Sequence, residues 1–297
     1  MTPDRKHPHM VTRFAPSPTG RLHIGHGWSA LMAMDFARGT GGQIRLRIED
    51  IDGTRSRPEH VDGIIEDLSW LGVEWDGEVV LQSQRLALYD AALDRLRAMG
   101  LVYPCFCTRA EIAAEIAASG SAPHGPEGPV YPGTCRNMTE SERSARIAAG
   151  DAHCWRLDMT QAVSQAGALE WQDMDAGAVA AHPERAGDVV LARKDAPTSY
   201  HLAATLDDAD MGITHVLRGE DLRAATDIHR LLQALLALPT PVYRHHPLLV
   251  DAQGRRLAKR TGGIALADLR ESGVDPARLR ADLRAGRFPV GIALASA

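Results

Sequence analysis

The chain has 297 residues, of which 44% are hydrophobic and 24% charged, and its formal net charge is −5. This composition provides enough apolar material for a core and excludes a disordered chain, and the negative charge excludes a broadly basic nucleic-acid-binding surface. No run of about 18 apolar residues occurs, and residues 1–10 lack the apolar centre of a signal peptide. We therefore expect a cytoplasmic protein that makes no contact with a membrane.

The first hundred residues carry the pattern of a parallel α/β unit. Residues 11–14 predict a short strand, and a Pro- and Gly-rich loop over residues 16–20 follows it. Apolar residues then recur at helical spacing, at Ala30, Ala33, Met34 and Ala37, before a glycine-rich stop. Residues 44–48 alternate as in a strand, which completes a βαβ unit, and residues 61–71 and 86–96 predict two further helices.

The pattern changes after residue 101. Residues 119–134 contain four Gly, four Pro and two Ser, a composition that fits neither a helix nor a central strand. This stretch predicts an irregular insertion that something other than an apolar core holds together. Residues 189–192, 200–206 and 213–217 predict strands.

The last part of the chain predicts mainly helices. An amphipathic helix carries Ile228, Leu231, Leu232 and Leu235 on one face, a turn follows at residues 251–254, and short helices cover 266–270 and 276–284. We expect the parallel α/β domain to comprise residues 1–100 and 186–245, split by an insertion at 101–185. Residues 246–297 would form a small C-terminal helical segment.

The strongest local signal is a loop followed by a helix start. Arg13-Phe14-Ala15-Pro16-Ser17-Pro18-Thr19-Gly20 precedes His23-Ile24-Gly25-His26. The free backbone N–H groups and the dipole of a helix start form an anion site. Gly25 has no Cβ, so we expect a flat purine to approach its backbone, and His23 and His26 can donate hydrogen bonds to a phosphate.

Three cysteines in the insertion predict a metal site. Cys105 and Cys107 are separated by one residue, and Cys135 follows after 27 more. Zinc needs four sulfur or nitrogen ligands in a tetrahedron, so a fourth ligand is required. His124 is the usual chemical choice, whereas Cys154 lies in a strand-like stretch and fits a buried thiol better. A Pro- and Gly-rich insertion favours such a structural metal.

With these motifs in view, the chain resembles the class I aminoacyl-tRNA synthetases, and their glutamyl branch in particular. His-Ile-Gly-His is the first signature of that class, and the preceding loop has the glutamyl form. Further stretches in the same order resemble the family at residues 47–52, 70–77, 82–85 and 217–222. The second signature, usually Lys-Met-Ser-Lys-Ser, corresponds to Arg256-Leu257-Ala258-Lys259-Arg260, in which the second lysine alone is kept.

The resemblance implies a Rossmann-type parallel sheet split by a zinc-containing insertion that contacts tRNA. The chain ends where a full glutamyl-tRNA synthetase would continue into an anticodon-binding domain, so we expect it to lack that domain. It therefore resembles the truncated glutamyl-Q tRNA(Asp) synthetases. Those ligases activate L-glutamate with ATP, bound as its Mg²⁺ complex, and attach it to queuosine in the anticodon stem-loop of tRNA(Asp).

The resemblance also implies roles for individual residues. His23, His26 and Lys259 would stabilise the transition state, and together with Gly25 they would bind ATP. The residues that match the glutamate pocket are Arg13, Ser17, Glu49, Tyr200 and Arg218. Among these, Arg13 would pair with the side-chain carboxylate and Glu49 with the α-ammonium group. Tyr131 matches an unusual zinc ligand of these relatives and would join Cys105, Cys107 and Cys135.

Two alternatives remain open. A short glutamyl-tRNA synthetase would charge the 3′ ends of tRNA, and the degenerate second signature is compatible with a non-catalytic paralogue that binds tRNA or nucleotide.

Overall fold

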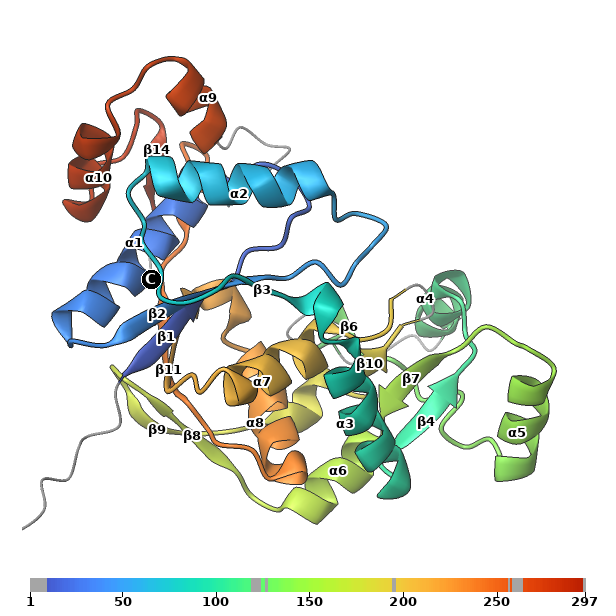
Figure 1. Cartoon of the computed structure of the whole chain (residues 1–297). Helices are drawn as coiled ribbons and strands as arrows, with labels where there is room; N and C mark the ends of the chain where they lie inside the picture. Colours follow the sequence, from blue (N-terminus) through green and yellow to red (C-terminus); the bar gives the residue numbers. More distant parts are fainter. Residues whose placement is uncertain are drawn as a thin grey trace, which may run out of the picture.

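The computed structural model describes residues 10–118, 124–125, 128–193, 196–255, 257 and 264–295. A mostly parallel sheet lies at its centre (Figure 1). On one side, β1 (Val11–Phe14) pairs with β2 (Gln43–Ile48), and β2 pairs with β3 (Val80–Leu81). On the other side, β11 (His215–Gly219) pairs with β12 (Val242–His246), and β12 pairs with β8 (Glu170–Asp173). An antiparallel strand, β9 (Gly177–Ala180), follows β8.

The two halves of this sheet meet between β1 and β11. The Thr214 N–H donates to the Val11 carbonyl at 2.9 Å, and the Val11 N–H donates to the Thr214 hydroxyl at 2.9 Å. A strand from the first fifteen residues therefore lies beside one that follows about 200 residues later. The predicted βαβ unit is confirmed, since β1 and β2 are parallel and a helix connects them.

Two layers of helices cover the sheet. On one face, α1 (Ile24–Gly39) and α2 (Pro58–Trp70) pack against α9 (Leu266–Glu271) and α10 (Pro276–Arg284). On the other, α3 (Leu86–Ala98), α6 (Met159–Ala166), α7 (Tyr200–Asp210) and α8 (Ala225–Leu236) share a second apolar cluster. The helices predicted from 3.6-residue periodicity are all present.

Residues 200–206 do not form the strand that we predicted. They form the first part of α7, which begins at the N-cap Ser199, whose hydroxyl accepts the Leu202 N–H. The residues from Leu202 to Asp208 are all buried, including the polar Thr205, Asp207 and Asp208, so this part of the helix has no solvent-exposed face. A helix that is buried on every side shows no amphipathic period, and its apolar run resembles that of a strand.

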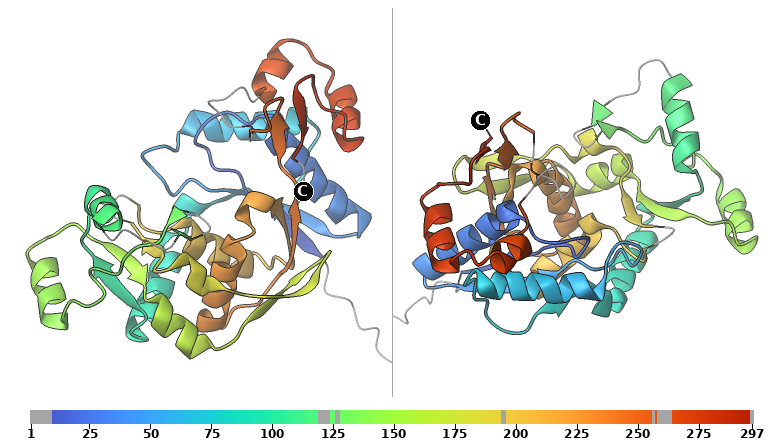
Figure 2. Two further views of the ribbon diagram at one scale, coloured as in Figure 1. Left: turned by 180° about the vertical axis from the view of Figure 1, so that it is seen from behind. Right: turned by 90° about the horizontal axis from the view of Figure 1, so that it is seen from above.

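The insertion forms a separate lobe. Its sheet consists of β4 (Val102–Cys105), β7 (Cys154–Leu157) and β10 (Val190–Ala192), and α4 (Arg109–Ala118) and α5 (Glu140–Ala148) flank it. The predicted end of the insertion at residue 185 is therefore too early for this sheet, because β10 pairs with β7. The three views place this lobe at the opposite end of the molecule from α9 and α10 (Figures 1 and 2). The shorter elements are β5 (His124–Gly125), β6 (Gly128–Pro129), β13 (Leu249–Asp251), β14 (Ile292–Leu294) and 3₁₀ turns at Gln82–Gln84, Pro183–Ala186 and Glu220–Leu222.

The segment 101–185 also contributes to the main sheet, because β8 lies within it and pairs with β12. No helix in the described part of the chain is long and apolar enough to span a bilayer.

Candidate active site

A pocket of about 560 Å³ opens at the carboxyl ends of β1, β2, β11 and β12. Ligands bind at this edge in parallel α/β sheets. The structure brings eight of the predicted site residues to its wall: Arg13, Ser17, His23, Gly25, His26, Glu49, Tyr200 and Arg218. They come from segments up to 205 positions apart in the sequence, so the fold assembles one site from dispersed motifs.

The start of α1 forms one end of the pocket. His23 is the N-cap, and its Nδ1 accepts the Gly25 N–H at 3.1 Å, while Nδ1 of His26 accepts the His23 N–H at 3.1 Å. The two rings stack with centroids 3.7 Å apart. Because a neutral imidazole carries its proton on the nitrogen that does not accept, these hydrogen bonds place an N–H on Nε2 of each ring. Both histidines are therefore hydrogen-bond donors at a helix start, as an anion requires.

Gly25 has a further structural role at this position. A Cβ there would lie 3.0 Å from Cε1 and 3.1 Å from Nδ1 of His23. A side chain would therefore displace the ring that caps the helix. The approach of a purine to Gly25 stays a prediction.

One residue of the second signature, Leu257, lines this end of the pocket. Arg256 and Lys259 lie outside the described residues, so the structure does not test the role of Lys259. Leu257, between them, is 4% exposed, lines the pocket and donates its N–H to the Leu249 carbonyl at 3.1 Å.

The opposite end of the pocket contains a buried network of charges. Arg13 is 4% exposed, and its Nε lies 3.1 Å from Oδ1 of Asp208. The same carboxylate oxygen accepts from Arg47 at 2.6 Å, and the second terminal nitrogen of Arg47 lies 3.2 Å from Glu49. Burial alone would raise the pKa of Asp208, but Arg13 and Arg47 lower it below the ordinary value.

Glu49 responds differently to the same surroundings. Burial raises the pKa of Glu49, and the opposing charges of Arg47 and Arg13 only partly offset that rise. A buried carboxylate of this kind gains from a cationic ligand group, which is what the proposed contact with an α-ammonium group supplies.

Sequence reasoning missed Arg47 and Asp208. Arg47 belongs to a family-like motif, but its alternation with apolar residues suggested a solvated strand face. Asp208 lies on α7, which we had predicted as a strand up to residue 206. The only signal was a pair of adjacent carboxylates, Asp207 and Asp208, after an apolar run.

Arg218 has a different set of partners. It is 5% exposed, and it donates hydrogen bonds to the Tyr200 hydroxyl at 3.1 Å, the Thr226 hydroxyl at 2.7 Å, His229 Nδ1 at 3.4 Å and His245 Nε2 at 3.3 Å. Burial and the charge of Arg218 lower the pKa of His245 to about 3 and keep the pKa of His229 well below its ordinary value. The acceptors of this guanidinium are therefore neutral.

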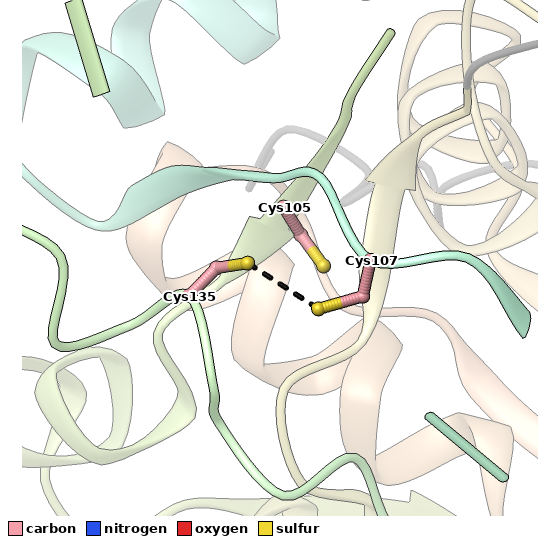
Figure 3. A group of neighbouring side chains, drawn as sticks. All are labelled: Cys105, Cys107 and Cys135. Carbon is pink, nitrogen blue, oxygen red and sulfur yellow. Dashed lines mark hydrogen bonds between the residues drawn. The ribbon is translucent and has the colours of Figure 1, made fainter. Parts of the chain in front are cut away.

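The three cysteines of the insertion form a second cluster (Figure 3). None of them lines the pocket. Their Sγ atoms lie within 4.8 Å of one another, and those of Cys107 and Cys135 are 3.4 Å apart. The Tyr131 hydroxyl lies 3.4 Å from Cys105 Sγ and 3.6 Å from Cys107 Sγ. A hydrogen bond from Cys154 and the charge of Arg156 lower the pKa of Cys105, which favours the thiolate that metals bind.

This arrangement fits the tetrahedral set of ligands that zinc prefers. The structure brings together the four predicted residues Cys105, Cys107, Tyr131 and Cys135. Cys154 is buried on β7 opposite Cys105 and is not part of the three-sulfur group, as expected of a structural thiol. The side chain of His124 lies outside the described part of the chain.

Comparisons with known proteins identify the family of the chain. The family "tRNA synthetases class I (E and Q), catalytic domain" matches residues 9–289. A glutamyl-Q tRNA(Asp) synthetase from Rhodobacter capsulatus is 49% identical over 276 residues, which cover 91% of this chain and 98% of that protein. The chain belongs to the glutamyl-Q tRNA(Asp) synthetase family, within the class I synthetases. A second relative of the same name, from Symbiobacterium thermophilum, is 45% identical and covers 89% of this chain and 82% of its own.

Relatives with longer chains match less completely. A glutamate–tRNA ligase 2 from a Methylobacterium species is 41% identical, but the match covers only 58% of that protein. The crystal structure of a glutamate–tRNA synthetase from Elizabethkingia anophelis has a TM-score of 0.72 and 29% identity, over 90% of this chain and 54% of its own. The class I synthetase fold and the use of ATP follow from membership of this family.

Proposed function

We propose that this glutamyl-Q tRNA(Asp) synthetase relative activates L-glutamate with ATP and transfers it to queuosine in the anticodon stem-loop of tRNA(Asp). The observation that carries the proposal is the combination found in one pocket. A helix start with two N–H-donating histidines faces the same cavity as a buried guanidinium, Arg218, that has no carboxylate partner among the described residues. The names of the relatives supply the acceptor.

In the first step, an oxygen of the glutamate α-carboxylate forms a bond to the α-phosphorus of ATP. The bond between that phosphorus and the bridging oxygen breaks, and pyrophosphate leaves as its Mg²⁺ complex. A carboxylate is already ionised, so the step needs no general base. His23, His26 and Lys259 would stabilise the charge that develops on the phosphates, and the walls of the pocket would align the reactants.

The glutamate would lie between Glu49 and the two guanidinium groups of Arg13 and Arg218. Glu49 would accept from the α-ammonium group, and Tyr200 and Ser17 would line the pocket beside it. In the second step, a hydroxyl of the queuosine ring attacks the carbonyl of glutamyl-adenylate. An ester forms, the bond between the acyl carbon and the phosphate oxygen breaks, and AMP leaves with the bonding electrons and takes up the proton that the hydroxyl loses.

We further propose that the insertion holds a structural zinc ion through Cys105, Cys107, Tyr131 and Cys135. When bound, the metal would cross-link β4 to the loop that carries Tyr131 and Cys135. The lobe that it stabilises, with the sheet of β4, β7 and β10 and the helices α4 and α5, is the part we propose to contact tRNA.

The first experiment tests activation. ATP–pyrophosphate exchange is measured without tRNA, with glutamate, glutamine or aspartate as the amino acid. Exchange with glutamate alone supports the proposal. A complete absence of exchange would favour the non-catalytic paralogue.

The second experiment tests the acceptor. Labelled glutamate is supplied with tRNA(Asp) purified from cells that make queuosine and from cells that do not, and tRNA(Glu) serves as a further substrate. We expect label only on the queuosine-containing tRNA(Asp). Equal labelling of queuosine-free tRNA would instead identify an enzyme that charges 3′ ends.

A further inference from the structure

Three buried side chains surround the guanidinium of Arg218 from behind the pocket: Thr226, His229 and His245. Thr226 is 0% and His229 2% exposed, and the side chain of His245 is 0% exposed. Thr226 and His229 lie on α8, and His245 lies on β12. None of the three lines the pocket, although each contacts the arginine that does. Any effect of these residues on a ligand would therefore pass through Arg218.

The two arginines of the pocket are neutralised to different degrees. Arg13 shares Asp208 with Arg47, and Arg47 also contacts Glu49 and, at 3.8 Å, Asp207. Around Arg218, every described hydrogen-bond acceptor is a hydroxyl or an imidazole, and none of the described carboxylates forms an ion pair with it. A charge buried in this way has to be stabilised by hydrogen bonds from neutral groups or by a ligand of opposite charge.

The protons of this cluster are arranged so that lone pairs face the guanidinium. His229 accepts from Arg218 at Nδ1, so its proton is on Nε2, which lies 3.4 Å from Nδ1 of His201. The Thr226 hydroxyl oxygen accepts from Arg218 at 2.7 Å and lies 3.2 Å from Nε2 of His245, the nitrogen that accepts the Nε–H of Arg218 at 3.3 Å. The described residues accept four of the five N–H groups of the guanidinium, so one is left for the pocket.

We propose that Thr226, His229 and His245 are positioning residues that hold Arg218 without a carboxylate partner inside the protein, and that this un-neutralised charge makes the site prefer a carboxylate over a carboxamide. The proposal rests on the proposed glutamate site and adds the residues that set its selectivity. Arg13, which is paired with Asp208, would then mainly orient the ligand. Arg218 would supply the positive charge that attracts the carboxylate of the ligand.

Thr226 offers the sharpest test, because three substitutions separate shape from charge. Thr226→Val keeps the shape and removes the oxygen that accepts from Arg218. Thr226→Ser keeps the oxygen. Thr226→Asp places a carboxylate behind Arg218 and neutralises it from within. Thr205→Val is a matched control, since Thr205 is 2% exposed, donates to a backbone carbonyl and lines no part of the pocket.

Two measurements are made on each full-length variant. Calorimetry gives the glutamate Kd without requiring turnover, and ATP–pyrophosphate exchange gives kcat and the KM values for glutamate and ATP. Glutamine and isoglutamine are tested as competitive inhibitors, because each replaces one carboxylate of glutamate by a carboxamide. The unfolding temperature of each variant reports on folding.

We expect Thr226→Val to weaken glutamate binding roughly tenfold and Thr226→Asp on the order of 100-fold, with the ATP KM changed less than about twofold. Thr226→Ser should recover most of the affinity, and Thr226→Asp should not lower the unfolding temperature. Of the two amides, glutamine and isoglutamine, one places its carboxamide group against Arg218. The affinity of the variants for that amide should be almost the same as the affinity of the parent protein.

Equal loss of affinity for glutamate and both amides would overturn the proposal, as would an unchanged glutamate Kd in Thr226→Val and Thr226→Asp. These outcomes are distinct from failure of the proposed function. In that case the unsubstituted protein would bind glutamate and respond to the substitutions, yet would not transfer glutamate to queuosine-containing tRNA(Asp).

Discussion

The pocket region and the insertion are held together by different forces. Around the pocket, two large apolar clusters cover the faces of the sheet, and the charged residues lie between them. Strands β7 and β10 of the lobe also pack on the second of these clusters, through Leu157, Leu191 and Ala192. The end of the insertion around the cysteines has its own cluster of six buried residues, three of which are cysteines. A small lobe with so little buried apolar surface depends on cross-links, whereas the sheet depends on packing and on the pairing of its buried charges.

The strongest way to break this comparison is to remove the zinc ion that we propose for the insertion. Structural zinc sites in small peptides are worth about 10–16 kcal/mol, so chelation or Cys135→Ser should unfold the lobe locally. Hydrogen exchange should become fast over residues 102–157 and stay slow in α1 and α8. Tyr131→Phe should weaken binding of Zn²⁺, measured by competition with a chelator.

Cys154→Ala is the control for the metal site, because Cys154 is buried in the same lobe without belonging to the three-sulfur group. It should retain zinc, with a smaller loss of affinity than Cys135→Ser, because it removes only the hydrogen bond that favours the Cys105 thiolate and no member of the three-sulfur group. Slow exchange throughout the metal-free lobe would show that the two regions are stabilised alike.

The matching test in the pocket region is Asp208→Asn, which leaves two buried guanidinium groups without their shared carboxylate. We expect a loss of about 3–5 kcal/mol in the free energy of unfolding, measured with denaturant. Because the pKa of Asp208 is lowered in the folded state, its stabilisation is present above the unfolded pKa near 3.8 and is lost as pH falls through the folded value. The variant should therefore lose less stability than the parent on acidification below that pH.

Asp210→Asn on the same helix is the matched control. Asp210 pairs with Arg85, but its side chain is 55% exposed. Its substitution should change stability by less than about 1 kcal/mol. Equal effects of the two substitutions would contradict the importance of burial.

A third test sharpens the contrast between catalysis and folding inside the pocket region. His26→Ala removes one proposed phosphate donor and should lower kcat for exchange roughly 10²- to 10³-fold, with a smaller change in glutamate KM. The control is His60→Ala, because His60 lies on α2 and lines no part of the pocket. This substitution should leave kcat unchanged. A KM effect without a kcat effect would place His26 outside the reacting centre.

The smallest expected effect concerns Glu49. Its pKa is raised in the folded state above 4.5, so the ionised group opposes folding, and this penalty grows as pH rises from 4.5 through the folded pKa. Glu49→Gln should therefore stabilise the ligand-free protein at neutral pH by on the order of 1 kcal/mol while weakening glutamate binding about tenfold. Thermal unfolding from pH 4 to 8 checks the gain in stability, and calorimetry over the same range checks the loss of glutamate affinity. A variant that is less stable at neutral pH would contradict the raised pKa.

The sequence predicted those parts of the molecule in which local pattern and tertiary environment agree. The helix from Ile24 to Gly39 and the cysteine cluster both carry short-range signals, through periodicity and through spacing. α7 was misread because its buried surroundings erase the periodic signal. The network of Arg47 and Asp208 was missed because residues 161 positions apart meet only in the folded protein.

The residues that we propose to set selectivity could not be predicted from the sequence for the same reason. Arg218 and Tyr200 could be expected in the pocket from family-like motifs, but nothing local links Arg218 to His245 or His229. Their contacts depend on how α8 packs against the parallel pair β11 and β12.

The pairing of β1 with β11 has a consequence for biosynthesis. The edge of β1 that accepts from Thr214 is made within the first fifteen residues, whereas its partner is translated about 200 residues later. At typical elongation rates of about 5–20 residues per second, this edge waits roughly 10–40 s for its neighbour. During that interval β1 can pair with β2 on one side while its other edge stays open, so folding of the central sheet is completed late in translation.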